Sequence, residues 1–431
     1  MTDQTPVLHP RPRVTRADWV DLNGTWQFAY DDADAGLGER WPENPGKFDR
    51  QIVVPFAPES QMSGIGDTGF HPVLWYRRTF AAPATAGRVL LHFGAVDYRA
   101  SVWVNGDLVA THEGGHTPFT ADITASLKAG AEQVVVVRAE DRPGDVTQPR
   151  GKQDWQEKPH AIWYNRTSGI WQTVWLEPVP RTYIADFQLT PELTDGSVKV
   201  EAALNAAFSG FLHVRLAAHG VVLAEQSVRL DGDRLETRLQ IPAATNGVNR
   251  NYLYWTPDNP NLIDVTATLL GADAKSVDSV QSYFGLRSVG IANGRFLLND
   301  RPVFVRSVLE QGYWPKSHLT APSADALKHE VELIKSLGFN AVRIHQKIED
   351  PRFLYWADHL GLMVWGEIAN AYEYNAQAVD RLTREWLSAV KRDRSHPCIV
   401  TWVPINESWG VSDIAIRRDQ QDFATSLYYL T

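Results

Sequence analysis

The pair Asn406-Glu407 places an amide and a carboxylate side by side, directly after the apolar run CIVTWVPI (398–405). A carboxyl group at the end of a buried strand is partly desolvated, which favours its protonated form and suits it to act as a general acid. The neighbouring amide can both donate and accept hydrogen bonds. The structural alternative is a loop glutamate that caps the next helix. The pair therefore indicates either acid–base chemistry or a helix cap.

Polar residues also follow three other apolar runs of this region: Glu310-Gln311, His345, and Glu367 with Asn370. In a (β/α)8 barrel the carboxyl ends of all strands lie on one rim, where barrel enzymes carry out their chemistry. Because several polar strand ends would meet on that rim, we interpret Glu407 as a functional residue rather than a cap.

Helical segments are expected between these runs, each with a recognisable start or stop signal. They cover 325–337 (Ser323 as cap, Gly338 after the end), the segment from Asp350-Pro351 to Gly361, and 376–394. Four β-α alternations with apolar strands predict a parallel sheet with helices outside it. A complete barrel needs eight such units and about 250 residues. We therefore expect residues 286–431 to be the first half of a barrel, and the sequence to be a fragment.

The first two-thirds of the chain are expected to be all-β. In residues 1–180, short alternating runs predict a sandwich or jelly roll, and Asn105-Gly106 within VWVNGDLVA predicts a hairpin with a type I′ turn. Residues 181–285 alternate again, and about seven short strands in about 100 residues are typical of an immunoglobulin-like sandwich. The predicted fold class is a jelly-roll sugar-binding domain, an immunoglobulin-like β-sandwich and the first half of a (β/α)8 TIM barrel.

The composition excludes several classes of function. The chain has 431 residues, a formal net charge of −9 and no long run of Lys or Arg, which argues against nucleic acid and anionic membranes as partners. No apolar stretch reaches the length of about 18 residues that a membrane span needs. A single cysteine, Cys398, excludes an internal disulfide, and the first residues lack the apolar part of a signal peptide. We therefore expect a cytoplasmic protein.

Two motifs could suggest a metal or a nucleophile. HEGGH (112–116) matches the zinc-protease pattern H-E-x-x-H, which binds zinc only from a helix. Two glycines separate these histidines in a β-rich region, so we expect a loop and no metal. Cys398 lies within a strand pattern and is expected to be a buried structural thiol. We expect no cofactor.

Aromatic residues are unusually frequent, with 16 Trp and 14 Tyr. Aromatic rings fill cores, and they also form the apolar surfaces on which sugar rings rest. The loop-rich segment 150–177 contains four of the Trp residues. This segment is either a surface loop packed by its own rings or a wall over the pocket of a neighbouring domain. The aromatic content as a whole favours a carbohydrate-handling protein.

Over nearly its whole length the chain resembles glycoside hydrolase family 2, which contains β-galactosidases, β-glucuronidases and β-mannosidases. The segments that resemble the family's jelly roll are LNGTWQF (22–28), WYRRTF (75–80) and VDYRASVWVNGDLVATHEGGHTPFTADI (96–123). Those that resemble its immunoglobulin-like domain are WTPDNPNLIDVTATL (255–269) and YFGLRS (283–288). Those that resemble its barrel are FLLNDRPVFVRSVLEQGYWP (296–315), FNAVRIHQKIEDPRFLYWADHLGLMVWGEI (339–368) and HPCIVTWVPINESWG (396–410).

The resemblance implies a retaining exo-β-glycosidase with Glu407 as general acid/base and Asn406 as the group that holds the sugar 2-hydroxyl. It also implies a second carboxylate, the nucleophile, about 5–5.5 Å away. In the family this residue lies on strand seven, beyond the last residue of this sequence, so we expect little or no hydrolase activity from the chain. The residues expected to bind substrate are Arg343, His345, Glu310, Trp365, Glu367 and Trp409. For Arg343 an ion pair within the barrel is an equally good interpretation. The run LEQGYWP (309–315) departs from the His-Glu-Asp type run of many members, so the sugar does not follow from the resemblance.

Two other interpretations stay open. One is a non-catalytic carbohydrate-binding protein, in which the two β-domains bind glycans beside a vestigial barrel. The other is an interaction scaffold, because half a barrel exposes strand edges that can pair with a partner. In the preferred interpretation the partner is a carbohydrate, either a β-glycoside or an oligosaccharide, and homo-oligomerisation is left open.

Overall fold

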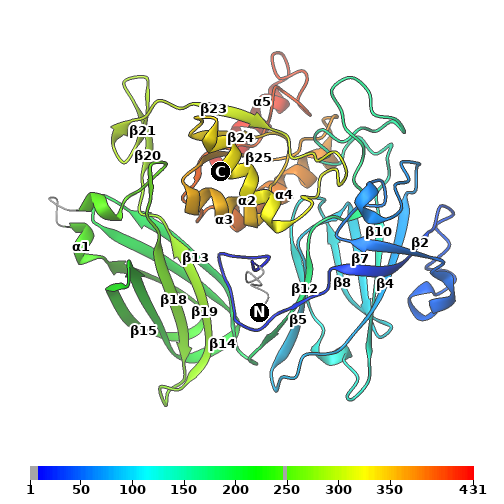
Figure 1. Cartoon of the computed structure of the whole chain (residues 1–431), viewed down its shortest axis with the longest axis horizontal. Helices are drawn as coiled ribbons and strands as arrows, with labels where there is room; N and C mark the ends of the chain where they lie inside the picture. Colours follow the sequence, from blue (N-terminus) through cyan, green and yellow to red (C-terminus); the bar gives the residue numbers. More distant parts are fainter. Residues whose placement is uncertain (1–7, 246–249) are drawn as a thin grey trace.

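The computed structural model describes residues 8–245 and 250–431. Figure 1 shows a β-sandwich built from the N-terminal part of the chain, a second sandwich from the middle, and a group of βα units from the C-terminal part that lies across both. The N-terminal segment runs between the two sandwiches (Figure 1). Short 3-10 helices occur at Trp41–Glu43, Pro45–Lys47, Gln61–Ser63, Thr124–Ser126 and Arg250–Leu253.

Two antiparallel sheets form the first sandwich, and their apolar faces share a core that includes Trp26, Phe93 and Val137. The larger sheet has the order β3 (Arg50–Val54), β2 (Gly24–Tyr30), β4 (Val73–Phe80), β10 (Gln133–Glu140), β7 (Arg99–Val104), β8 (Asp107–Glu113). The smaller sheet has the order β1 (Val20–Asp21), β12 (Val174–Val179), β5 (Arg88–Phe93), β9 (Phe119–Asp122). A short pair joins β6 (Val96–Asp97) to β11 (Gly169–Ile170). The jelly-roll prediction is confirmed.

The predicted hairpin is present between β7 and β8, where Val104 pairs with Asp107. Asn105 and Gly106 have φ values of 53° and 97°. A type I′ turn needs positive φ at both central residues, and asparagine and glycine tolerate it best. The local sequence therefore determines this turn.

The second sandwich has fewer and longer strands than the expected seven short ones. Its sheet joins β13 (Ile184–Glu192), β14 (Ser197–Ala218), β18 (Ile263–Leu270) and β19 (Ser276–Phe284), with β15 (Val221–Gln240) paired to β14. The first half of β14 pairs with β13 and its second half with β18, and the β14–β15 register shifts between Ala203 and Phe208. Such a shift bends a strand without ending it. The alternation of buried and exposed residues breaks at the bend, at residues 205–209, so the two halves of β14 were predicted as separate strands.

Smaller elements connect this sandwich to the C-terminal units. They are α1 (Pro242–Thr245), the pair β16 (Trp255–Thr256) and β17 (Asn259–Pro260), and a three-stranded sheet of β20 (Val289–Ala292), β21 (Arg295–Leu298) and β22 (Arg301–Pro302). The run 301–309 was expected to be one strand. Instead β22 pairs with β21, and the first strand of the parallel sheet begins only at Ser307.

The C-terminal part is a four-stranded parallel sheet with helices on one face, as predicted. The strands are β23 (Ser307–Glu310), β24 (Ala341–Ile344), β25 (Met363–Glu367) and β26 (Ile399–Val403). The helices are α2 (Ala324–Ser336), α3 (Pro351–Leu360), α4 (Ala376–Asp393) and α5 (Arg418–Leu430). The side chain of Ser323 caps α2, and Gly361, with φ of 78°, follows α3. These local signals set the helix ends where the sequence predicts them.

The two faces of the parallel sheet differ. Val342 and Ile344 of β24 face the helices and share a core with Leu327 of α2 and Phe353 of α3. The opposite, inner face is open at its edge, where Leu309 on strand β23 is 49% exposed. Side chains of a strand alternate between the two faces of the sheet, so Arg343, between Val342 and Ile344, lies on the inner face. Its cross-strand neighbour Leu309 lies on the same face. This inner face carries most of the candidate site.

Ion pairs fix the parts relative to one another. Arg381 on α4 is 2% exposed and donates to Glu113 and Asp145 of the jelly roll at 2.9 and 2.8 Å. Arg16 of the N-terminal segment contacts Glu177 of the jelly roll at 3.0 Å and Asp278 of the second sandwich at 2.7 Å. Breaking such a buried ion pair is unfavourable, because it leaves a charge buried without its partner. These ion pairs therefore hold the domains together. The site described next spans one of these junctions.

Candidate active site

Arg343, Glu367 and Asn406 form a connected group at the carboxyl ends of three neighbouring strands. Arg343 Nε donates to Glu367 Oε2 at 2.9 Å, and its Nη2 lies 2.8 Å from the same oxygen. The Nη2 atom also donates to Asn406 Oδ1. Asn406 is 1% exposed and Glu367 is 2% exposed. The planar guanidinium can make all these bonds at once, so it holds both partners in fixed orientations.

A second amide supports Asn406 from behind. Asn370 is fully buried, accepts from the Asn406 backbone N–H at 2.8 Å, and donates to the carbonyl of Pro404 at 2.9 Å. The Nδ2 atom of Asn406 is buried and has no acceptor among residues 8–245 and 250–431. A buried donor without an acceptor is costly, and a ligand hydroxyl would satisfy it. Asn406 is therefore oriented to donate one hydrogen bond.

His345 and Trp365 join this group. His345 Nδ1 lies 3.2 Å from Glu367 Oε1, which also accepts from the backbone N–H of Gln346 at 2.9 Å. Trp365 is the cross-strand neighbour of Arg343 and shares its inner face. Trp365 Nε1 is buried with no acceptor in the described part of the chain. Four of the expected substrate-binding residues thus lie together with Asn406. Both carboxylate oxygens of Glu367 are occupied by contacts that orient its neighbours.

Glu407 is exposed, which differs from the partly desolvated position expected for it. Unlike the buried Asn406 that precedes it, Glu407 lies at the rim of an open pocket. Its backbone is unusual, because Glu407 and Ser408 have φ values of 47° and 66°. Left-handed backbone at residues other than glycine is strained and occurs preferentially at functional sites. This turn projects the Glu407 carboxylate from the strand end, free of hydrogen bonds and ion pairs to the described residues.

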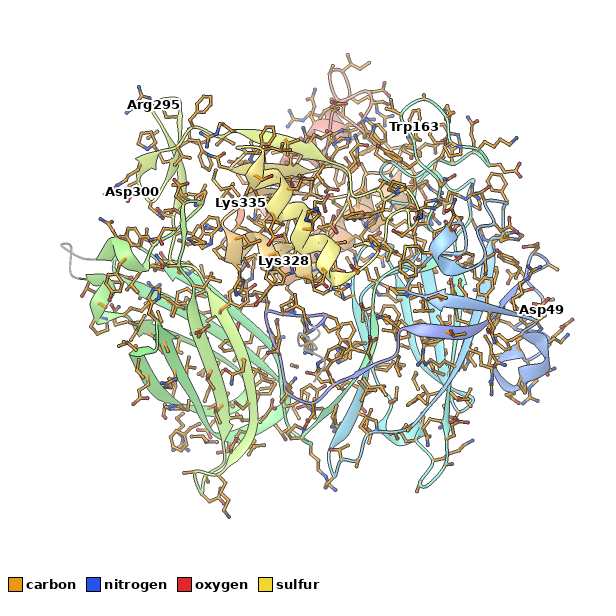
Figure 2. The ribbon with its side chains drawn as sticks, in the orientation of Figure 1. Asp49, Trp163, Arg295, Asp300, Lys328 and Lys335 are labelled. Carbon is orange, nitrogen blue, oxygen red and sulfur yellow. The ribbon has the colours of Figure 1, made fainter. Side chains whose placement is uncertain are left out.

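Glu407 borders an open pocket of about 410 Å³ whose walls come from two domains. Trp409 and Tyr372 belong to the βα units, whereas Trp155 and Trp163 belong to the jelly-roll loop within 150–177. The Trp163 and Trp409 ring centroids are 5.9 Å apart, and those of Tyr372 and Trp409 are 5.5 Å apart. Figure 2 labels Trp163 on the loop that rises from the jelly roll beside the βα units. The loop is therefore a wall of this pocket.

Lys152 of the same loop lies beside Trp409 and Glu407. It is 6% exposed, and its Nζ lies 5.1 Å from the Trp409 ring centroid. Burial lowers the pKa of Lys152, while the charge of Glu407 favours its protonated form. Tyr372 fixes the loop here, because its hydroxyl lies 2.7 and 2.6 Å from the carbonyls of Gly151 and Gln153.

The structure does not bring Glu310 to this group, contrary to the sequence-based expectation. Glu310 pairs with Ile344, so its side chain lies on the helix-facing side of the sheet, one position out of phase with Arg343. Burial raises the pKa of Glu310 well above its usual value, and the nearby carboxylate of Glu349 raises it further. Lys347, which pairs with Glu349 at 2.8 Å, acts in the opposite direction. Glu310 therefore belongs to a buried charge cluster rather than to the pocket.

The other candidate motifs have structural roles. In HEGGH, His112 and Glu113 end strand β8 rather than lying in a loop, and no helix is formed. His116 is buried against Trp171 with a ring-centroid distance of 5.4 Å. Trp171 and Trp175 of the aromatic segment are likewise buried, so only Trp155 and Trp163 of the four reach the pocket.

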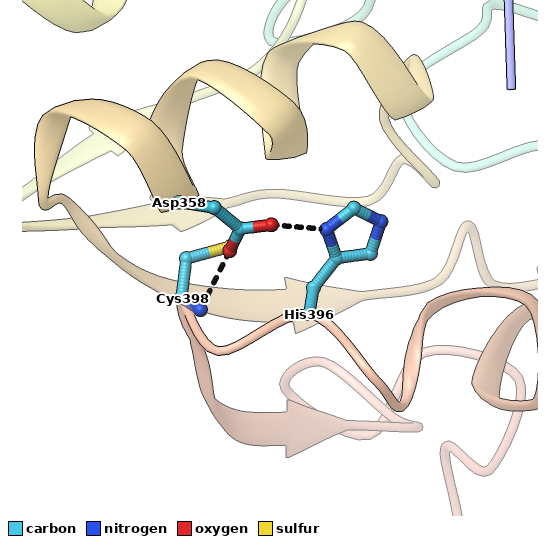
Figure 3. A group of neighbouring side chains, drawn as sticks. All are labelled: Asp358, His396 and Cys398. Atoms are coloured by element: carbon cyan, nitrogen blue, oxygen red, sulfur yellow. Dashed lines mark hydrogen bonds and ion pairs between the residues drawn. The ribbon is translucent and has the colours of Figure 1, made fainter. Parts of the chain in front are cut away.

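Asp358, His396 and Cys398 have potential metal ligand atoms within 4.8 Å of one another (Figure 3). Asp358 lies 2.5 Å from His396 Nδ1 and accepts from the Cys398 backbone N–H and the Tyr283 hydroxyl, each at 2.9 Å. These contacts occupy both carboxylate oxygens. The group therefore joins the second sandwich, through Tyr283, to α3 and β26. Cys398 is completely buried, as predicted, and burial raises the pKa of its thiol.

Several residues of the site were not predicted. Lys152, Gln346 and Tyr372 carry no local signal, since their roles depend on which loop packs against which strand end. Trp155 and Trp163 were included only as members of the segment 150–177. A periodic or spacing argument cannot find residues whose neighbours come from another domain.

The sequence matches three models of glycosyl hydrolases family 2: the sugar binding domain over residues 20–180, the family 2 domain over 182–287 and the TIM barrel domain over 289–425. This chain belongs to glycosyl hydrolases family 2. The order of the matched domains is the order of the three parts in Figure 1. The predicted family and fold class are confirmed.

Curated family 2 relatives include a β-galactosidase of Thermoanaerobacter pseudethanolicus, 29% identical over 436 residues that cover 95% of this chain and 53% of that protein. A β-glucuronidase of Paenibacillus borealis is 25% identical over 450 residues, which cover 96% of this chain and 72% of that protein. The chain thus spans about half the length of the first of these relatives.

Solved structures of the same shape include a β-glucuronidase from Ruminococcus gnavus in complex with C6-substituted uronic isofagomine. Its TM-score is 0.81 at 21% identity, and the match covers 97% of this chain and 71% of that chain. The apo structure of the Ruminococcus gnavus enzyme has a TM-score of 0.79 at 20% identity. At this identity the likeness concerns the fold. No helix among residues 8–245 and 250–431 is long and apolar enough to cross a bilayer.

Proposed function

We propose that this chain is the N-terminal part of an exo-acting β-glycosidase with a retaining mechanism, in which Glu407 is the general acid/base. The observation that carries the proposal is the turn at Asn406-Glu407, where Asn406 is fixed by Arg343 and Asn370 and the next carboxylate projects into a sugar-sized pocket. The named activities of the relatives, β-galactosidase and β-glucuronidase, support the reaction class.

In this mechanism Glu407 protonates the glycosidic oxygen as the bond to the leaving group breaks. It then accepts a proton from the water that releases the sugar. The free Nδ2 of Asn406 donates to the sugar 2-hydroxyl, a bond that strengthens as positive charge develops on the ring. Arg343, His345, Trp365, Glu367 and Trp409 form the walls around the sugar, with Glu367 acting through Arg343 and His345.

The second carboxylate of a retaining site lies about 5–5.5 Å from the first. Glu367 is paired with Arg343 and is not assigned this role. We propose that the nucleophile is supplied by a further barrel strand, that the 431 residues alone hydrolyse little or nothing, and that no cofactor is needed. Domain limits of 1–180, 181–285 and 286–431 and a cytoplasmic location are part of the same proposal.

The test is a paired assay on a panel of nitrophenyl β-glycosides. One sample is the 431-residue chain, and the other is a chain extended by about 150 residues to complete a barrel of usual size. Turnover by the extended form alone, abolished by Glu407→Gln, is the expected result, and the panel then identifies the sugar. If Glu407→Gln leaves turnover intact, the assignment of Glu407 as the general acid/base is wrong. Glycan binding without turnover in either form would favour a carbohydrate-binding protein.

A further inference from the structure

We infer that a small monovalent anion, of which chloride is the common example, binds in a narrow cavity where three parts of the chain meet. The cavity has a volume of about 60 Å³ and lies between the N-terminal segment, the jelly roll and the βα units. Its walls include Arg13 of the segment, Gln172 and Trp175 of the jelly roll, and Arg352 and Arg392 of the βα units. The inference goes beyond the proposed function, because it involves none of the residues assigned to the sugar or to catalysis.

Hydrogen-bond donors without acceptors are gathered around this cavity. Four buried nitrogen atoms of its wall residues have no acceptor among residues 8–245 and 250–431: Arg13 Nε, Gln172 Nε2, Trp175 Nε1 and Arg392 Nη1. Gln172 and Trp175 are each 4% exposed, and Arg13 is 5% exposed. A buried donor without an acceptor is costly, since it has lost its bond to water. Because all four atoms are donors, the group that would satisfy them is an acceptor.

Arg13 carries a buried charge that forms no ion pair with a carboxylate of the described chain. Its Nη1 donates to two backbone carbonyls, that of Tyr283 and that of Ser395, the latter at 2.9 Å. Its guanidinium also lies over the Tyr283 ring, 5.4 Å from the centroid. Arginine is rarely buried without a carboxylate, because the guanidinium loses its hydration. An anion in the cavity would supply the counter-charge.

The other charged side chains of the walls are already paired. The pairs are Arg352 with Asp350, Arg392 with Asp393, Arg11 with Glu177 and His396 with Asp358. Arg352 and Arg392 each hold both carboxylate oxygens of their partner, so these aspartates are not free to turn toward Arg13. Within the described part of the chain, Arg13 is thus the charged wall residue that lacks a counter-ion of its own.

The class of anion follows from charge, size and surroundings. One unpaired arginine calls for one negative charge, and a dianion such as sulfate would bring a second charge that nothing compensates. A volume of about 60 Å³ exceeds the roughly 10–15 Å³ that one water needs, but it is far below the size of a site for a sugar or a nucleotide. The apolar parts of the walls favour an anion that gives up its water easily, and they include Pro10, Pro12, Pro118 and Pro351. Chloride and bromide meet these conditions.

Binding at this place would tie the three parts together. Arg13 belongs to the segment that runs between the two sandwiches (Figure 1), Gln172 and Trp175 to the jelly roll, and Arg392 to the last turn of α4. An anion that accepts from all of them binds only when the three parts are docked. A ligand that binds the folded state alone stabilises it, and the gain grows with ligand concentration. Chloride should therefore stabilise the folded chain in a saturable way.

Chlorine NMR on the 431-residue chain measures the binding directly, because a bound chloride broadens the signal of the free ion. The ionic strength is held constant with the bulky anion of the buffer MES in place of chloride. The excess line width should saturate, and bromide should displace chloride at a similar concentration. The melting temperature should rise by roughly 3 °C at a chloride concentration 100 times the dissociation constant.

Variants assign the binding to this cavity. Arg13→Gln should abolish the saturable broadening, because the counter-charge is gone. Trp175→Phe keeps an aromatic ring but removes one N–H donor, so it should weaken chloride binding roughly tenfold, the loss expected for one hydrogen bond to a charged group. Gln172→Glu places a carboxylate in the same cavity as Arg13 and should abolish both chloride binding and the response of the melting temperature. Arg234→Gln, a change at an exposed arginine of β15, is the matched control and should alter neither.

The inference is overturned if the broadening does not saturate, or if it persists unchanged in Trp175→Phe and Gln172→Glu. These two variants decide the question even if Arg13→Gln fails to fold. Displacement of chloride by phosphate at a lower concentration than by bromide overturns the choice of a monovalent anion. Every readout is independent of hydrolysis, so Glu407→Gln should bind chloride like the wild type whatever becomes of the proposed function.

Discussion

Arg343 and Glu367 are held together across neighbouring strands by two nitrogen–oxygen contacts of 2.9 and 2.8 Å. This ion pair does more than join β24 to β25. Because the same guanidinium donates to Asn406, the orientation of the amide also depends on the carboxylate of Glu367. Groups that orient a site residue are often nearly as important to activity as that residue.

Arg343→Lys should lower kcat/KM of the barrel-complete enzyme by about 10- to 100-fold, because lysine cannot bind Glu367 and Asn406 together in one plane. The loss should be larger in kcat than in KM, since the bond from Asn406 to the sugar strengthens in the transition state. Steady-state kinetics on the best nitrophenyl substrate measures both. An unchanged kcat in a folded variant contradicts the positioning role.

Glu310→Gln and Glu367→Gln form a matched pair that tests the placement of the two glutamates. Burial and the nearby carboxylate of Glu349 raise the pKa of Glu310, which favours its neutral form, so the neutral amide should replace it with less than about a twofold change in kcat/KM. Glu367→Gln should reduce kcat/KM strongly, since Arg343 and His345 lose their shared partner. Equal losses of kcat/KM in both variants would contradict the assignment of Glu310 to the helix-facing side of the sheet.

Asp358→Ala should destabilise the protein by about 3 to 5 kcal/mol, because it leaves three buried hydrogen-bonding groups without their shared acceptor and each such group costs about 1 to 3 kcal/mol. His396 and the backbone N–H of Cys398 lose their acceptor, and so does the hydroxyl of Tyr283. Tyr283→Phe removes one hydrogen bond alone and should cost about 1 kcal/mol. Urea unfolding of both variants and of the double variant measures the coupling. Strictly additive losses would show that the three groups do not act together.

Glu385 should make the protein less stable as the pH rises. Its carboxylate is 2% exposed at the contact of α4 with the jelly roll, where it accepts from the His116 N–H and lies near Tyr98, Glu113 and Arg381. Burial raises its pKa from 4.5 to about 8. Between these values the folded state keeps a proton that the unfolded state has released, so folding stability falls through this window and levels off above it.

Glu385→Gln removes this titration while preserving the shape of the side chain. The variant should therefore lose less stability than the wild type between about pH 5 and pH 8, as measured by urea unfolding at each pH. Glu132→Gln, a change at an exposed glutamate, is the control and should leave the pH dependence of the unfolding free energy unaltered. If the unfolding free energy changes with pH equally in wild type and Glu385→Gln, the Glu385 carboxylate does not titrate between about pH 5 and pH 8.

Features governed by local chemistry could be predicted from the sequence. Ser323 and Gly361 mark helix ends because capping and left-handed backbone involve only neighbouring residues. Asn406 and Glu407 were found because a polar pair after an apolar strand is a local pattern. Glu310 was misplaced because the strand begins at Ser307, so the run 301–309 did not reveal which face the residue would take.

The pocket could not be predicted for a different reason. Trp163 and Tyr372 meet only after two domains have packed together, and no spacing in the sequence encodes that contact. The bent strand β14 shows the same limit, because the strand continues although its alternation breaks where its pairing partner changes. Pairing and packing between distant segments decide these features.

The contact between Trp163 and Trp409 joins segments that are encoded far apart, and this has a consequence for how the protein can diversify. In the proposed function the acid/base carboxylate belongs to the βα units, whereas Trp155 and Trp163 in the wall of the pocket beside it belong to the jelly-roll loop. Insertions or exchanges in this loop would therefore change one wall of the pocket without disturbing the strand that precedes Glu407. Under the proposed function, reactivity and selectivity would then be able to evolve separately, and grafting this loop alone would be a route to changing one without the other.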